Sequence, residues 1–286
     1  MALVKRFLIF IFLLSIFSIH PQPKNPLITD GLKAYYPFNE DEKDLSGNGN
    51  DANVNDASYG DDRFNNPYSS LRLAGDIAEL PMMPKKIISF WIKCEEYSSM
   101  AILSAGDPAK EMGGAEIFAV KKGDLRWPYA DSNRKSYPFK PENFEGILFF
   151  TGDSMRYMSG EAHSVAIPCK IFDKKWHHLV FGVNSGAKLI FFIDGKEARG
   201  YISTRDCADA LMPTYGSWTD ILTSPFVFKK ELENGELPVC FGKIALNELK
   251  YYGLTACKSF NGFIDDVRIF DRNLKSSEIK LLFEEK

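Results

Sequence analysis

The segment "VFGVNSGAKLIFFIDGKEARGY", residues 180–201, determines the predicted fold. It contains two short apolar runs separated by Asn184-Ser185-Gly186, and the second run is followed by Asp194-Gly195. Asn, Asp and Gly adopt the backbone conformations with positive φ that tight hairpins need. We therefore expect this segment to form an antiparallel meander.

The rest of the chain repeats this pattern, with short apolar runs bounded by Gly, Asn, Asp or Pro and almost no helical periodicity. We expect strands at 33–38, 70–75, 87–94, 101–106, 146–152, 176–184, 188–195, 237–244 and 260–270. Many short strands with intervening turns are typical of an all-β sandwich or barrel. One short helix is expected at 274–285, with Ser276 or Ser277 as its N-cap.

The composition fits one large domain and argues against a nucleic-acid partner. The chain has 286 residues, 45% of them apolar, and a net charge of -3, so no basic surplus exists to bind phosphates. Lys5 and Arg6 precede an apolar run that ends at Ile19, which is typical of a secretory signal peptide and too short for a comfortable membrane span. We expect residues 1–20 to be this signal, 21–286 to be a single domain without a membrane span, and the protein to be secreted or at the cell surface.

The five cysteines carry no zinc pattern, because their spacings contain no C-x-x-C pair and no Cys/His cluster. An odd number leaves at least one thiol free or intermolecular in an exported protein. Cys94 ends a strand-like run and is expected to be a buried thiol. Cys207, Cys240 and Cys257 are the better disulfide candidates, and Cys169 completes the set.

Three blocks of the sequence together resemble one family. The opening block, 31–75, contains "YYPF", "DLSGNGN" and "SLRLAG"; the middle contains "ISFWIK", "AILSAGD" and "KWHHLVFGVNSGAKLIFFIDGKEA"; the close is "FNGFIDDVRIFDRNLKSSEIKLLF". In this order they resemble a laminin G-like jelly-roll domain of the concanavalin A-like lectin/glucanase superfamily.

The resemblance implies two antiparallel sheets packed face to face, with the segment around Tyr35 paired to the segment around Asp265. It also implies binding far more often than catalysis. Residues 107–166 and 203–237 fall between the matching blocks and do not have the pattern of regular strands, so we expect them to be long loops inserted into the jelly roll.

The two acids in "FIDDVRIF" require an explanation. Strict alternation places Asp265 and Asp266 on opposite faces of the strand, and both faces also carry apolar residues. One carboxylate must therefore lie near a buried surface, where it needs a cation, an arginine or backbone donors.

The polar stretch "DLSGNGND", residues 44–51, has two interpretations. The resemblance implies a structural calcium ion in many family members, and the terminal strands are neighbours in such jelly rolls. Oxygen-rich side chains on a curled backbone suit this ion, and the candidate ligands are Asp44, Asn48, Asn50, Asp265 and Asp266. The alternative is a plain Asn/Gly turn held by Asx hydrogen bonds, with Asp266 paired to Arg268 or Arg72.

The sequence gives no support for catalysis. Retaining glycoside hydrolysis needs two carboxyl groups about 5 Å apart, yet the chain has no E-x-D-x-E strand, and alternation separates Asp265 from Asp266. It also contains no G-x-S-x-G and no phosphate-binding loop.

We therefore expect an exported, non-catalytic binding module that recognises carbohydrate or a surface or matrix protein. A structural or assembly protein of the cell surface is the alternative, and a divergent glycoside hydrolase is the third. The candidate ligand-binding residues are Trp127, Tyr129, Tyr215 and Trp218, whose rings could stack on sugar faces. The alternative for each ring is that it fixes its own loop to the sandwich.

Overall fold

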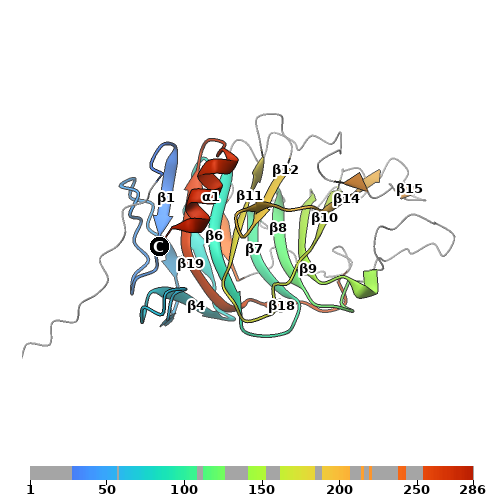
Figure 1. Ribbon diagram of the computed structural model, residues 1–286, viewed down its shortest axis with the longest axis horizontal. Helices are drawn as coiled ribbons and strands as arrows, with labels where there is room; N and C mark the ends of the chain where they lie inside the picture. The colour runs from blue at the N-terminus through green and yellow to red at the C-terminus, as the bar shows by residue number, and fades with distance from the viewer. Residues whose placement is uncertain are drawn as a thin grey trace, which may run out of the picture.

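The chain folds into two β-sheets packed face to face, and the described residues include one α-helix on the outside (Figure 1) and a 3-10 helix at Pro141–Asn143. The computed structural model describes residues 28–56, 58–107, 112–125, 141–152, 162–183, 189–206, 214–215, 219–220, 238–242 and 254–285. The α-helix is α1 (Ser276–Glu284). The predicted all-β sandwich with a short C-terminal helix is confirmed.

The first sheet has eight strands within the described residues and contains both ends of the fold. In spatial order these are β13 (Lys196–Glu197), β12 (Leu189–Ile193), β11 (His177–Val183), β6 (Ile87–Cys94), β19 (Asn261–Phe270), β4 (Ser70–Ala74) and β3 (Ser58–Gly60), and β1 (Leu32–Tyr36) also pairs with β19. Tyr35 lies opposite Arg268 in that pair. The expected pairing of the N-terminal and C-terminal strands is therefore present.

The second sheet has eleven described strands. They are β15 (Thr214–Tyr215), β14 (Tyr201–Asp206), β10 (Ala162–Pro168), β9 (Gly146–Gly152), β8 (Met112–Val120), β7 (Met100–Asp107), β17 (Val239–Phe241), β5 (Ala78–Leu80) and β2 (Asn53–Val54), with β16 (Thr219–Asp220) on β14 and β18 (Lys258–Ser259) on β7. The β18–β7 pair is parallel, and the other pairs are antiparallel.

The expectation that 107–166 and 203–237 form long irregular loops is wrong for their described parts, because β8, β15 and β16 lie within them and β10 begins within the first. In β8, Ile117 packs into the core between the sheets, whereas Phe118 and Val120 pack into a second apolar cluster on the opposite face. A strand that is apolar on both faces lacks the alternation by which a strand is recognised.

The main core lies between the sheets and follows the alternation of the strands. Phe90 of β6 points inward, and its ring packs edge-on against Phe241 of the opposite sheet, with centroids 5.1 Å apart. Phe149 of the second sheet similarly meets Phe191 of the first at 5.4 Å. Each such ring buried between the layers stabilises the fold by about 1.5–3 kcal/mol.

Helix α1 covers part of the outward face of the eight-stranded sheet (Figure 1). Ile279 and Leu282 are fully buried in a separate apolar cluster that includes Ile87 and Phe270 of the sheet. The expected serine cap is wrong: the N-cap residue is Lys275, whose main-chain N donates to Glu278 Oε2 at 2.7 Å. No helix in the described part of the chain is long and apolar enough to cross a membrane.

No disulfide joins any two of Cys94, Cys169, Cys240 and Cys257, and Cys94 is buried as expected. The expected disulfide is therefore not present among these four, and Cys207 lies outside the described residues. The signal-peptide prediction concerns residues that the structure does not describe.

Candidate functional site

An open groove lies on the outward face of the eight-stranded sheet, beside the part that α1 covers. Its volume is about 540 Å³, and it is lined by Arg63, Phe64, Trp91, Trp176, Phe283, Glu284 and Glu285. These residues come from the loop between β3 and β4, from β6, from the residue before β11 and from the end of α1. Four separate parts of the fold thus converge on one aromatic surface.

The aromatic rings of the groove are stacked. Trp91 and Phe283 lie almost parallel, with centroids 5.6 Å apart and 16° between their planes. The Arg63 guanidinium carbon lies 4.7 Å from the Trp91 ring centroid and 4.4 Å from that of Phe64. Arg63 therefore contacts two rings through cation–π interactions, each worth about 0.5–2 kcal/mol.

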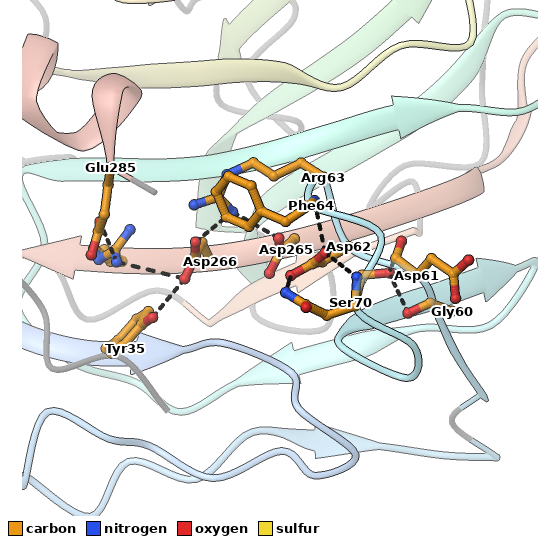
Figure 2. A network of polar contacts seen from close by, with 12 residues as sticks. Tyr35, Gly60, Asp61, Asp62, Arg63, Phe64, Ser70, Asp265, Asp266 and Glu285 are labelled. Carbon is orange, nitrogen blue, oxygen red and sulfur yellow. Dashed lines mark hydrogen bonds and ion pairs between the residues drawn. The ribbon is translucent and has the colours of Figure 1, made fainter. Parts of the chain in front are cut away.

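The loop that carries Arg63 and Phe64 is held by hydrogen bonds to Asp62. Asp62 Oδ1 accepts from the main-chain N of Phe64 at 2.8 Å and of Asn66 at 2.9 Å, and its Oδ2 accepts from Asn66 Nδ2 (Figure 2). At the base of the loop, Ser70 Oγ donates to the carbonyl of Asp61 at 3.0 Å. The loop is thus fixed with Phe64 at the rim, where its side chain is 38% exposed.

Asp265 and Asp266 lie on the same side of β19, beneath Arg63 (Figure 2). The register of β19 against β6 shifts between Asp265 and Arg268, and Asp266 has φ of 49°. This β-bulge inserts one extra residue and corrects the expectation that alternation separates the two acids. Arg63 Nη1 lies 2.8 Å from Asp265 Oδ2 and 2.5 Å from Asp266 Oδ2.

The acids continue into a buried network. Tyr35 Oη donates to Asp266 Oδ1 at 2.6 Å, and Arg268 Nη2 lies 3.5 Å from the same oxygen and 2.7 Å from Glu285 Oε2. Arg268 is fully buried, with its guanidinium over the Tyr35 ring at 4.3 Å. The alternative in which Asp266 pairs with Arg268 is therefore present, with Arg63 as a further partner that the sequence did not indicate.

The network gives the two acids different protonation behaviour. Burial, followed by the charge of Asp266, raises the pKa of Asp265 well above its usual value. Burial also opposes ionisation of Asp266, but Arg268 and Arg63 outweigh it and lower the pKa of Asp266. Asp266 is therefore the carboxylate that the two arginines hold ionised.

The candidate calcium ligands do not converge. Asp44 Oδ1 accepts from the main-chain N of Tyr35 at 2.9 Å, whereas Asp266 accepts from the Tyr35 hydroxyl, at the opposite end of that residue. Arg63 occupies the position beside Asp265 and Asp266 that a cation would take. These five residues do not fit one shared ion, and the described residues contain no group of three or more His, Cys, Asp or Glu that could hold a metal. Calcium elsewhere in the domain stays a prediction.

The loop 44–51 instead covers the free edge of β1. Asn48 Nδ2 and Asn50 Nδ2 donate to the Lys33 carbonyl at 3.2 and 2.8 Å, and the Leu45 main-chain N donates to the Tyr35 carbonyl at 2.8 Å. Asp44 accepts from the main-chain N of Asn50 at 3.0 Å. An exposed strand edge is a template for unwanted pairing with another strand, and this loop satisfies the edge with both side-chain and main-chain hydrogen bonds.

The four aromatic residues predicted as ligand contacts are not tested by the structure. Trp127, Tyr129 and Trp218 lie outside the described residues, and only the backbone of Tyr215 is described, in β15. The groove residues were missed because Trp91 lies between Phe90 and Ile92 in a mainly apolar strand and Arg63 lies in a polar loop. Neither context distinguishes a surface residue from a core or turn residue.

No family model matches the sequence, and no curated protein matches it. Several solved structures share the fold. The botulinum neurotoxin serotype D/C VPI 5993 binding domain is 14% identical with a TM-score of 0.52. A botulinum neurotoxin DC binding domain in complex with rat synaptotagmin II is 13% identical with a TM-score of 0.50. A botulinum neurotoxin type C structure is 14% identical with a TM-score of 0.52.

These alignments cover 90% of this chain and 51–52% of the matched chains, so this chain spans about half their length. The likeness shows a jelly-roll-like β-sandwich. The narrower assignment to the laminin G-like family stays a prediction.

Proposed function

We propose that this protein is an exported, non-catalytic binding module that recognises carbohydrate through the outward groove, with a surface or matrix protein as the other partner class. The open aromatic groove carries the proposal. Trp176 and Phe283 are only half-buried and Phe64 is partly exposed, so their rings present apolar area to a ligand. Rigid rings bind the apolar faces of sugars at low entropic cost.

The state of the acids supports a binding role over hydrolysis. Asp265 and Asp266 lie on one face, but their side chains are only 4% and 11% exposed and both contact Arg63. A general acid and a nucleophile must reach the glycosidic bond. In this arrangement the Arg63 guanidinium lies against both carboxylates. The two acids therefore hold the β3–β4 loop in place and are not free to act on a substrate.

The similar structures support the same class of function. Two are described as binding domains, one of them in complex with rat synaptotagmin II, and the third is described by cell entry that depends on interaction with two ganglioside molecules. Export is supported by Lys5, Arg6 and the apolar run that follows them.

A panel of glycans tests the proposal, with binding measured in calcium and again in chelator. We expect at least one glycan to bind wild-type protein and Trp176→Tyr, because tyrosine preserves stacking. Trp176→Ala should weaken this binding about tenfold or more. The matched control is Tyr97→Ala, which removes an aromatic side chain that is 53% exposed but does not line the groove. Absence of glycan binding, or equal effects of the two alanine variants, would refute a glycan site in the groove.

A further inference from the structure

We infer that the groove selects neutral sugars over acidic ones. This inference rests on the proposed function and specifies its ligand class. It is carried by the balance of charge around the aromatic rings, which is fixed by ion pairs within the fold.

The single cation among the residues that line the groove is already paired. Arg63 Nη1 contacts both Asp265 and Asp266, and the side chain is only 6% exposed. Its charge is therefore balanced within the protein. Its Nε and Nη2 have no hydrogen-bond partner in the described part of the chain, but both atoms are buried. An acidic sugar would therefore have to bury its own charge to reach this cation, which is costly in an apolar setting.

The remaining charged residues of the groove are acidic. Glu284 and Glu285 both line it, at the end of α1. Glu285 lies 2.7 Å from Arg268, whose Nη2 also approaches Asp266. Lys280 Nζ also lies 3.6 Å from Glu284 Oε1. Three cations, Arg63, Arg268 and Lys280, thus face four acids in this region, so no positive charge is in excess even when Asp265 holds a proton.

A neutral sugar suits this surface. Its C–H face can lie on Trp176 or Phe283, and its hydroxyl groups can donate to Glu284, whose side chain is 54% exposed. Trp91 adds a buried indole N–H that has no hydrogen-bond acceptor in the described part of the chain. A sugar hydroxyl oxygen is an acceptor of the right kind for it, whereas a carboxylate would bring its charge close to Glu284.

Matched glycan pairs test this inference on the full protein. Each pair shares one core, and one member carries a terminal sialic acid or replaces a hexose with a uronic acid. We expect the neutral member to bind about tenfold more tightly, since one like charge near the rim costs about that factor. Glu284→Lys should remove most of this preference, and it is compatible with a helix C-terminus. The control Glu79→Lys, at an exposed position in β5 of the other sheet, should leave the preference unchanged.

The outcomes separate the two claims. Equal or tighter binding of the acidic member, abolished by Trp176→Ala, would overturn the neutral preference and leave the groove as the glycan site. Binding that ignores Trp176→Ala, or no binding to either member, would overturn the proposed function and this inference together. An unchanged preference in Glu284→Lys would overturn the charge argument.

Discussion

Replacing Arg63 with methionine is predicted to destabilise the protein strongly. Methionine keeps an apolar side chain between Phe64 and Trp91 but removes the charge. Arg63 Nη1 lies 2.8 Å from Asp265 and 2.5 Å from Asp266, and all three side chains are at most 11% exposed. Breaking a buried ion pair costs about 3–5 kcal/mol, because an uncompensated charge remains in the interior.

The same geometry predicts a partial rescue. In the Arg63→Met variant Asp266 keeps Arg268 and the Tyr35 hydroxyl, whereas Asp265 loses its cation. Asp265→Asn in that background removes the uncompensated carboxyl group, so we expect it to recover about 1–3 kcal/mol of the loss. The control is Arg72→Met. Arg72 also stacks on a ring, that of Phe263 at 5.0 Å, but it donates to the neutral side chain of Asn261 at 2.9 Å. We expect this control to cost only about 1 kcal/mol.

Urea unfolding at pH 7, followed by tryptophan fluorescence, measures these free energies of unfolding. A loss below about 1 kcal/mol for Arg63→Met would refute the buried ion pair. A double variant no more stable than Arg63→Met would refute the role of Asp265 as its partner.

Three further predictions concern other parts of the fold. Burial, followed by the charges of Arg268 and Arg63, lowers the pKa of His178 to about 3. Below about pH 6.5 the unfolded state therefore binds more protons than the folded state. The free energy of unfolding should fall by up to about 1.4 kcal/mol per pH unit as the pH is lowered toward 3. His178→Gln should flatten this slope in urea titrations at several pH values, and an unchanged slope would contradict the assignment. Asp44→Ala should lower the free energy of unfolding by about 2–4 kcal/mol, since it removes the acceptor for the main-chain N of Tyr35, Ser46 and Asn50. Thermal unfolding tests this prediction. A loss of stability no larger than that of Asp41→Ala would argue that the loop 44–51 does not stabilise the edge of β1. Gly60→Ala would place a Cβ 2.3 Å from the Phe263 ring, so it should cost about 1–3 kcal/mol of stability and weaken glycan binding. Calorimetry that shows neither effect would contradict the close packing of Gly60 against Phe263.

The sequence predicts strands well where one pattern rule applies. The bounds of β6 and β9 agree with the predicted 87–94 and 146–152, because β6 is a mainly apolar run limited by charged residues and β9 is an apolar run with a glycine at each end. In β19 the alternation rule fails at Asp266, where the backbone adopts φ of 49°. A bulge changes the face of every later residue, and no residue type in "FIDDVRIF" marks its position.

The groove is harder to predict because it depends on long-range contacts. Arg63 and Asp265 are 202 positions apart in the chain, and their pairing requires both the β3–β4 loop and the bulge. Phe283 has the spacing of a core residue of α1, yet it stacks on Trp91 beside the groove. Helical periodicity indicates which face is apolar, but it cannot show where the covered area of the sheet ends.

The indole N–H signals of the four tryptophans provide the most direct test of the groove as the binding site. We would assign the signals in a ¹⁵N-labelled protein with single Trp→Phe variants and then titrate the best glycan from the panel. The groove site predicts that the signals of Trp91 and Trp176 shift, while those of Trp127 and Trp218 stay in place. Shifts confined to Trp127 and Trp218 would contradict the groove and favour the site predicted from the sequence at these two residues.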